Sequence, residues 1–195
     1  MEARKIIKGL NCSLVRFKND DEKLVELIYK LFNDKGIAEY LNPDYLNYKA
    51  KFKIRKWIKM KSDNPVEVWY LIKAKRDYIG YVCFKWRKHY DEACEISTAI
   101  VNEFRGLKLG YESSKILIEY ILSLEKFKYI AGYVHYKNPK AANNLRKVGF
   151  QKAQHLHKTI TVQFYNDDGT STTGRKYILY VIYAKSKSKI KKVIL

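Results

Sequence analysis

The stretch AIVNEFRGLKLG, residues 99–110, is where the character of the chain changes. An apolar run ends there, a short turn follows, and a long helical pattern begins with glycines and cations in its first turn. The first N–H groups of a helix have no partner within the helix and lie at the positive end of its dipole, so they bind phosphate. Gly106 and Gly110 permit close approach to the backbone, and Arg105 and Lys108 add positive charge. We predict a phosphate site here, against the alternative of a helix start that merely contains glycine.

A second segment, NPKAANNLRKVGF at residues 138–150, follows a buried-strand pattern in residues 129–136. It ends at Gly149, a residue typical of helix C-termini. Together the two segments resemble the GNAT superfamily of acetyl-coenzyme A-dependent N-acetyltransferases. That family has the markers Arg/Gln-x-x-Gly-x-Gly/Ala and Asn-x-x-Ala/Ser followed by Lys-x-Gly-Phe. The residues that match these markers are Arg105, Gly110, Asn138, Ala141, Lys147, Gly149 and Phe150.

The residue-level likeness spans about residues 92–152, and the expected order of strands and helices agrees over essentially the whole chain. The run EISTAI, residues 95–100, also resembles the branch that contains ribosomal-protein N-terminal acetyltransferases and relatives acting on small amines. The resemblance implies a mixed α/β domain whose mostly antiparallel sheet is splayed in the middle. It also implies acetyl-coenzyme A as the co-substrate.

By this resemblance, one strand edge and one helix start hold the cofactor. The backbone of residues 98–101 would pair with the pantetheine arm, because an extended amide arm offers alternating donors and acceptors to a strand edge. The N–H groups of residues 105–110 would bind the pyrophosphate, and Asn138 would bind the pantetheine region. The implied cofactor-binding residues are Thr98, Ala99, Ile100, Val101, Arg105, Gly106, Leu107, Lys108, Leu109, Gly110, Asn138, Ala141 and Asn143.

Two residues depart from the family pattern. Lys108 stands at the family's middle glycine, where its ammonium would reach a phosphate or crowd it. Leu145 stands seven residues after Asn138, where the family often has a tyrosine that protonates the departing thiolate. The usual proton donor is therefore missing at that place.

Acetyl transfer to an amine requires a neutral amine, a polarised carbonyl and often a proton donor for the sulfur. Glu95 is the leading candidate for the base, with an ordinary strand carboxylate paired to lysine as the alternative. Tyr136 is the candidate replacement acid, and His135 would be a base only if it faced the cofactor slot. A backbone N–H near Ile100 would polarise the thioester carbonyl, and catalysis by positioning alone also stays open.

The remaining pattern predicts a single domain at residues 1–184 and a basic tail at 185–195. We expect about seven strands and about four helices. The expected strands are residues 10–17, 66–74, 78–86, 92–101, 129–136, 150–165 and 176–184. The first expected helix carries the apolar residues Leu24, Leu27, Ile28 and Leu31. The other expected helices are residues 43–60, 107–124 and 138–148. A polar loop, residues 166–175, would join the last two strands.

Composition and net charge restrict the compartment and the partners that we expect for this chain. The chain has 39 Lys and Arg against 20 Asp and Glu, a formal charge of +19, which attracts anionic partners. Solubility and a lysine-rich composition are the alternative reading of that charge. The three cysteines form no metal-type pair, no apolar run is long enough for a bilayer, and the first ten residues lack a secretory signal. His155 and His157 share a strand face without further ligands, so we expect a cytoplasmic protein without a metal site.

The acceptor would be a protein N-terminus, a lysine, an aminosugar or another small amine. The charge favours acceptors carried on acidic bodies such as a ribosome, nucleic acid or a nucleotide-sugar, and no membrane partner is expected. Two alternatives stay open. One is a catalytically weak GNAT-fold module that binds nucleic acid or an acidic partner through its basic surface, and the other is a coenzyme A sensor. The chain would act as a monomer or a homodimer.

Overall fold

The central strands form where apolar residues alternate along the chain. In the computed structural model they are β3 (Glu67–Ala74), β4 (Asp77–Arg87) and β5 (Ala93–Ile100), paired antiparallel in sequence order. The structure describes residues 3–18, 21–41, 48–87, 93–153, 159–165 and 171–184. The predicted meander is confirmed, and each described strand end lies within one residue of its expected position.

Two short strands, β1 (Ile6–Lys8) and β2 (Ser13–Arg16), precede the meander at one edge of the sheet. The strand expected at residues 10–17 is therefore shorter than predicted, and β1 was not predicted. Glu112 of α4 (Leu109–Ser123) holds the turn between them, because its carboxylate accepts hydrogen bonds from the N–H of Asn11 (2.7 Å) and of Cys12 (3.2 Å). Such a tertiary contact leaves no local signal in the sequence.

Helix α1 (Glu22–Asn33) buries the apolar stripe that predicted it. Its N-cap is Asp21, whose side chain accepts a hydrogen bond from the N–H of Lys23 at 2.9 Å. A single helical turn, α2 (Lys35–Ala38), follows and is capped in the same way by Asp34. This turn was not predicted, since four residues are too few to show a helical period.

The helix expected at residues 43–60 is α3 (Lys51–Asp63), and the predicted start was wrong over the described residues 48–50. Residues 43–47 lie outside the described part of the chain. Tyr48 extended the apolar pattern, but it packs against the core from non-helical backbone. The helix buries Ile54, Trp57 and Ile58, which the period did predict.

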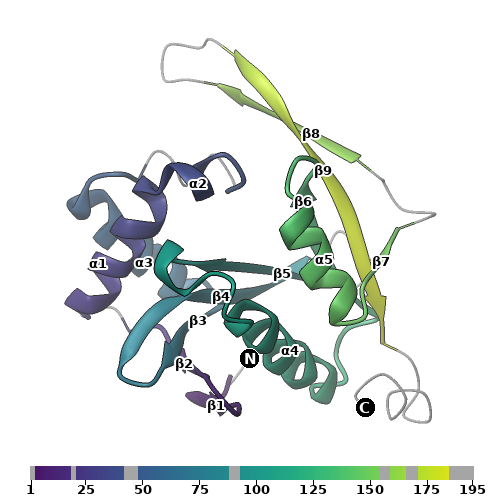
Figure 1. The fold of residues 1–195 in the computed structure, drawn as a ribbon, viewed down its shortest axis with the longest axis horizontal. Coiled ribbons are helices and arrows are strands. Elements are labelled where there is room, and N and C mark those ends of the chain that lie inside the picture. Colours follow the sequence, from purple (N-terminus) through teal and green to yellow (C-terminus); the bar gives the residue numbers. More distant parts are fainter. Residues whose placement is uncertain are drawn as a thin grey trace.

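The sheet separates two layers of helices (Figure 1). One hydrophobic cluster joins α1 and α3 to one face of β3 and β4, through residues such as Trp69 and Tyr81. The other face packs against α4 through the alternate residues Tyr70 and Val82. This alternation is the period of two expected for a strand buried on both sides.

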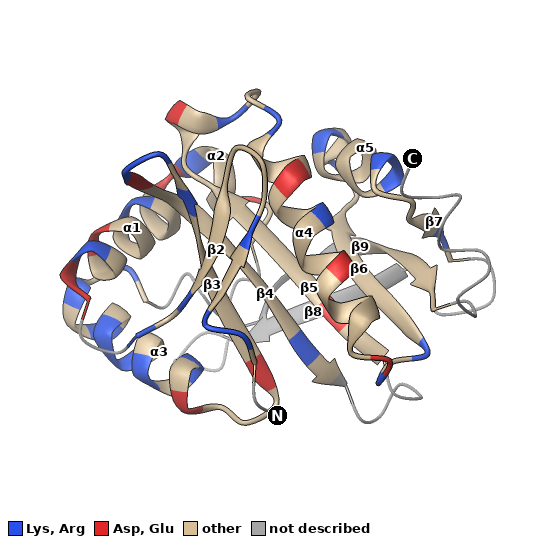
Figure 2. Cartoon of the chain, turned by 90° about the horizontal axis from the view of Figure 1, so that it is seen from below, with Lys and Arg blue, Asp and Glu red and all other residues tan. Residues whose placement is uncertain are grey.

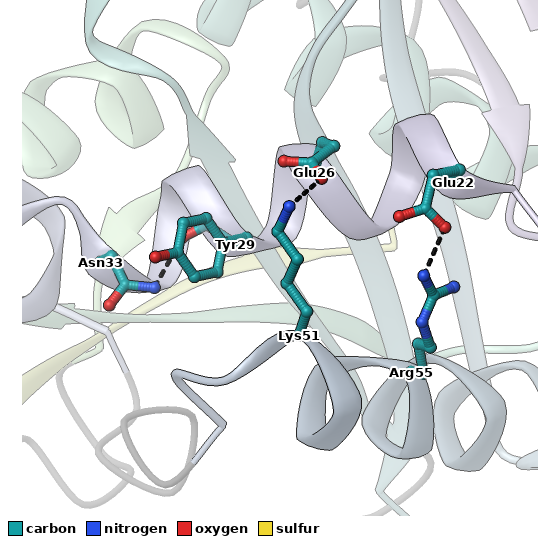
Figure 3. A network of polar contacts seen from close by, with 6 residues as sticks. All are labelled: Glu22, Glu26, Tyr29, Asn33, Lys51 and Arg55. Atoms are coloured by element: carbon teal, nitrogen blue, oxygen red, sulfur yellow. Dashed lines mark hydrogen bonds and ion pairs between the residues drawn. The ribbon is translucent and has the colours of Figure 1, made fainter.

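Exposed ion pairs lie between α1 and α3 (Figure 3). Glu22 pairs with Arg55 and Glu26 pairs with Lys51, and all four side chains are about half exposed. Exposed pairs of this kind contribute little free energy, because water screens them and long side chains must be ordered. The buried apolar residues therefore supply most of the stability of this layer.

The second half of the chain begins with β6 (Tyr129–His135) and α5 (Pro139–Lys147), as predicted. The strand expected at residues 150–165 is two strands, β7 (Gln151–Lys152) and β8 (Thr159–Tyr165). The last strand, β9 (Ser171–Tyr183), begins five residues before the predicted Lys176. The polar residues before Lys176 concealed this start, because here the strand pairs with β8 in a ribbon extending beyond the body of the sheet (Figure 1).

The described strands form one nine-stranded sheet in the order β1-β2-β3-β4-β5-β6-β9-β7, with β8 paired to β9. All neighbouring strands are antiparallel except β5 and β6, which are parallel. The predicted fold class, a mixed α/β domain with a mostly antiparallel sheet, is confirmed with two more strands and one more helix than expected. The tail at residues 185–195 lies outside the described residues. Among the described helices, none combines the length and apolarity needed to cross a bilayer.

Candidate active site

The sheet opens between β5 and β6, the one parallel pair among the described strands. β5 and β6 are paired from Ala93 with Tyr129 to Ile96 with Gly132. Beyond these residues, the remaining parts of both strands have no recorded partner across the opening, within the described chain. The predicted splay is therefore present, and its closed end is at Ile96 and Gly132.

The edge of β5 at this opening offers backbone hydrogen-bonding groups. The N–H of Val101 donates to the carbonyl of Ile79 at 2.9 Å, so Val101 is directed toward β4. Because an antiparallel ladder alternates, Ala99 is also directed toward β4, whereas Thr98 and Ile100 present their N–H and C=O groups toward β6. Of the four predicted residues, these two have the backbone orientation that a bound amide arm requires.

The start of α4 lies directly after this strand edge. Its N-cap residue, Lys108, has φ 59° and ψ 2°, a left-handed conformation, and makes no side-chain capping bond. A cap without a side-chain bond leaves the first N–H groups of the helix available to an anion. Gly106 has φ +84°, and a Cβ built on it would meet no atom within 4 Å, so the backbone is open on this side.

The guanidinium of Arg105 is engaged within the protein. It donates to the carbonyl of Ile100 at 2.9 Å and to Oδ1 of Asn102 at 3.3 Å, and it forms an ion pair with Asp34. Arg105 thus ties the loop before α4 to the segment that begins α2. These contacts make Arg105 a brace of the loop, and its expected role as a countercharge for phosphate stays a prediction.

The second marker segment caps α5. Oδ1 of Asn138 accepts a hydrogen bond from the N–H of Ala141 at 3.0 Å, and Pro139 occupies the first helical position. The Ala141 N–H is therefore used by the cap. Asn143 is exposed, and its oxygen accepts a bond from Arg146 at 2.7 Å. Asn138 lies three residues after the end of β6, and its expected contact with the pantetheine region stays a prediction.

Leu145 lies against the closed end of the opening. A Cβ built on Gly132 would come within 2.9 Å of Cδ1 of Leu145, so this side chain lies directly over β6 where the strands separate. The residue that replaces the family's tyrosine therefore fills its space with a hydrocarbon. No hydroxyl is supplied from this position, as the sequence predicted.

Glu95 lies on the face of the sheet opposite to Leu145 and α4, one residue before the closed end of the opening. Its carboxylate lies 3.8 Å from Nζ of Lys85, and the two side chains are 17% and 7% exposed. A pairing with a lysine, the alternative reading of Glu95, is therefore present, and Lys85 is buried whereas Glu95 is only partly buried. A carboxylate beside the opening is suitable for accepting a proton from an amine.

The two other candidates sit at the end of β6. Tyr136 is half exposed. Its ring packs against the ring of His135, and Nζ of Lys137 lies over it. His135 is buried between the rings of Tyr40 and Tyr177, at centroid distances of 5.6 and 5.5 Å. His135 is therefore a packed aromatic residue that joins the α2 segment to β6 and β9, and Tyr136 is the more accessible of the two.

A family model described as acetyltransferase (GNAT) domain matches residues 13–151. The chain belongs to the GNAT acetyltransferase family. The match covers both marker segments and the opening between β5 and β6. A search of curated proteins found no significant match.

Solved structures agree with this GNAT fold. The ribosomal L7/L12 alpha-N-protein acetyltransferase RimL, in complex with coenzyme A, has a TM-score of 0.71 at 16% identity, covering 91% of this chain and 97% of its own. The spermidine N-acetyltransferase of Vibrio cholerae, with coenzyme A and spermine, has a TM-score of 0.70 at 16% identity, covering 95% and 99%. The microcin C7 self-immunity acetyltransferase MccE, with acetyl-CoA and AMP, has a TM-score of 0.69 at 18% identity, covering 90% and 93%. At these identities the likeness shows the shared fold.

Several features of the GNAT site had no sequence signal. The Arg105–Asp34 pair joins residues far apart in the chain, and the contacts of Lys85 with Glu95 and of Leu145 with Gly132 depend on strand register and helix packing. Among the described residues, no group of three or more His, Cys, Asp and Glu side chains could hold a metal ion. His155 and His157 lie outside the described residues.

Proposed function

We propose that this protein transfers the acetyl group of acetyl-CoA to a primary amine, by direct attack in a ternary complex. The observation that carries the proposal is the opening of the sheet between β5 and β6, with the uncapped start of α4 beside it. The N–H and C=O of Thr98 and the N–H of Ile100 suit the pantetheine amides, since the Ile100 carbonyl already accepts from Arg105. The N–H groups at the start of α4 suit the pyrophosphate. Lys108 adds a cation at the same place.

In the proposed reaction, Glu95 accepts a proton from the acceptor amine, directly or through water. The amine nitrogen then bonds to the acetyl carbon while the carbon–sulfur bond breaks, and coenzyme A leaves as the thiolate. A backbone N–H of Thr98 or Ile100 polarises the thioester carbonyl. Tyr136 is our candidate for protonating the thiolate, since Leu145 supplies no donor.

The acceptor belongs to the class of primary amines, which includes protein N-termini, lysine side chains and small amines or aminosugars. The formal charge of +19 favours acceptors attached to acidic bodies. We propose a cytoplasmic site of action, with a ribosome, nucleic acid or nucleotide-sugar as the acidic partner. The protein would act as a monomer or a homodimer.

The test is a titration of acetyl-CoA against thermal unfolding, followed by measurement of thiol release with pooled amine acceptors. A ligand that binds only the folded state raises the melting temperature with its concentration. We expect stabilisation, and thiol release that depends on the acceptor. An unchanged melting temperature at a large excess of cofactor would overturn the transferase and the sensor together. Binding without turnover on any amine would favour the sensor.

A further inference from the structure

Residues 34–41, which include α2, bridge the opening between β5 and β6, and we call them the strap. At one end, Asp34 forms an ion pair with Arg105, which follows β5 in the chain. At the other end, the hydroxyl of Tyr177 on β9 donates to the carbonyl of Leu41 at 3.1 Å, and β9 is the strand paired with β6. The strap is therefore attached on both sides of the opening, and Figure 1 shows α2 between α1 and the end of β6.

The strap packs on the face of the sheet that carries Glu95. Ile37 and Leu41 are buried in the hydrophobic cluster that contains Ala99 of β5, whereas α4 packs on the other face. Ala99 and Glu95 share a face, because side chains alternate along a strand. An amine that reaches Glu95, the proposed base, therefore approaches on the side of the strap. The proposed pyrophosphate site at the start of α4 lies toward the opposite face.

Asp34 joins the strap to the loop that precedes α4. Its Oδ1 accepts from the N–H of Gly36 at 2.8 Å and caps α2, while its Oδ2 pairs with Arg105. The same guanidinium donates to the carbonyl of Ile100 at 2.9 Å and to Oδ1 of Asn102 at 3.3 Å. A displacement of this loop when the pyrophosphate binds therefore acts on the strap through Asp34.

The strap and the guanidinium of Arg105 are also packed closely. A Cβ built on Gly36 would lie 3.3 Å from Nη1 of Arg105, which is closer than most Cβ contacts in proteins. The side chains of Arg105 and Asp34 are 34% and 22% exposed. Salt screens a partly buried pair less than a fully exposed one, so the attraction between loop and strap persists at physiological ionic strength.

Tyr177 holds the other end of the strap beside the candidate acid. Its ring is buried and lies 5.5 Å from that of His135, which in turn lies 5.6 Å from the ring of Tyr40 in the strap. The ring of Tyr136, our candidate for protonating the thiolate, lies 5.0 Å from that of His135. The end of the strap and the end of β6 therefore share one group of packed aromatic rings.

We propose that Asp34 and Tyr177 are positioning residues for acetyl transfer: they hold the strap so that coenzyme A on one side and the amine on the other favour the same position of it. The inference rests on the proposed function, because it takes the opening as the cofactor site. By linkage, the factor by which the cofactor strengthens amine binding equals the factor by which the amine strengthens cofactor binding. Asp34 transmits this coupling, and Tyr177 sets the position of the strap toward the amine.

The first test is hydrogen–deuterium exchange of the whole chain with and without saturating coenzyme A, read by mass spectrometry of peptides that cover the strap. In the natural chain, coenzyme A should slow exchange in residues 34–41 by about fivefold or more. Asp34→Asn keeps an oxygen to cap α2 but loses the charge opposite Arg105, so coenzyme A should then leave strap exchange nearly unchanged. The matched control is Asp21→Asn, at the cap of α1, which should keep the full slowing.

A merely structural role for Asp34 would speed exchange in the strap equally with and without coenzyme A, so the ratio of the two rates decides. A melting temperature that rises with coenzyme A, without slower exchange in the strap of the natural chain, would overturn the inference and leave the proposed function standing. An unchanged melting temperature would remove the cofactor site and both proposals. Equal slowing in Asp34→Asn and Asp21→Asn would overturn the role of Asp34.

The second test uses steady-state kinetics with the amine that gives the fastest thiol release in the pooled assay. Tyr177→Phe keeps the ring and loses the hydrogen bond to Leu41, so the KM for the amine should rise about fivefold while the affinity for coenzyme A changes little. The control is Tyr180→Phe, which removes from the same strand a hydroxyl that accepts a hydrogen bond from Arg146. Equal KM values for the amine in these two variants would overturn the role of Tyr177.

Discussion

Lys108 occupies a backbone conformation that glycine adopts at little cost and lysine does not. Its φ of 59° is left-handed, a region that costs a non-glycine residue about 1–2 kcal/mol. Where the family has a glycine, this chain keeps a left-handed backbone and gains a cation at the start of α4. We infer that the charge offsets the strain when a phosphate is bound.

The charge and the strain at Lys108 can be separated by two substitutions. Lys108→Ala removes the charge and keeps the strain, whereas Lys108→Gly removes both. Each should weaken acetyl-CoA binding by about two- to fivefold, because one exposed charge contributes up to about 1 kcal/mol. Calorimetric titration measures the affinity, and urea unfolding should show that only Lys108→Gly escapes the backbone cost. Unchanged affinity in both variants would show that the pyrophosphate binds elsewhere.

Leu145, which places a hydrocarbon at the closed end of the opening, can be substituted to test whether a proton donor at this position speeds the reaction. Leu145→Tyr places a hydroxyl where the resemblance puts the proton donor, and Leu145→Phe adds the same ring without the hydroxyl. We expect a higher kcat for thiol release in the tyrosine variant than in the phenylalanine variant. Both rings crowd Gly132, so their stabilities should fall together. Equal kcat values would show that thiolate protonation does not limit the rate.

Arg105 connects elements rather than acting alone. Its guanidinium joins the loop before α4 to Asp34, which also caps α2 through the N–H of Gly36 at 2.8 Å. We expect a double-mutant cycle of Arg105→Ala and Asp34→Ala to give a coupling free energy of unfolding of about 0.5–1 kcal/mol, since the pair is partly exposed. A coupling energy of zero would mean that the pair does not contribute.

Glu67 of β3, in register with Lys85 and 3.0 Å from Nζ of Lys61, makes the stability of the sheet depend on pH. The pKa of Glu67 is lower in the folded protein than its ordinary value of 4.5, so its contribution is present above that value. The contribution is lost as the pH falls from about 4.5 through the lower folded pKa. Unfolding free energies measured by urea at several pH values should fall less steeply with acid in Glu67→Gln than in the natural chain. A parallel fall would contradict the assignment.

The charge of the whole molecule decides how anions reach it. Lysines and arginines are spread over α1, α3 and α5 as well as near the opening (Figure 2). We expect the association rate of acetyl-CoA to fall as salt is added, because long-range attraction is screened. Stopped-flow measurements between low and physiological ionic strength test this. If the protein is instead a module that binds nucleic acid, its affinity for a mixed-sequence RNA should fall steeply as salt is added.

At the same scale, the sequence alone predicted the fold class, which the structure confirms, and a location for the cofactor site, which stays a prediction. Both depend on short-range patterns: alternation in the meander, the helical period of α1 and α4, and two marker segments each contained within a dozen or so residues. Two predicted boundaries were wrong over described residues: the single strand at residues 150–165 and the start of the second helix. Polar strand residues show no clear alternation, and Tyr48 extended the apolar pattern of the helix although its backbone is not helical. These boundaries depend on pairing partners rather than on local composition.

Only the tertiary structure decided what surrounds the site that residues 99–110 begin. It placed Arg105 on Asp34 and Leu145 on Gly132, and it set Glu95 beside Lys85, which lies beside Glu67. Such contacts form only through strand register and packing, which depend on the whole core. The local pattern therefore identified which residues could bind the cofactor, and the packing of the sheet determined which charges act on the candidate base.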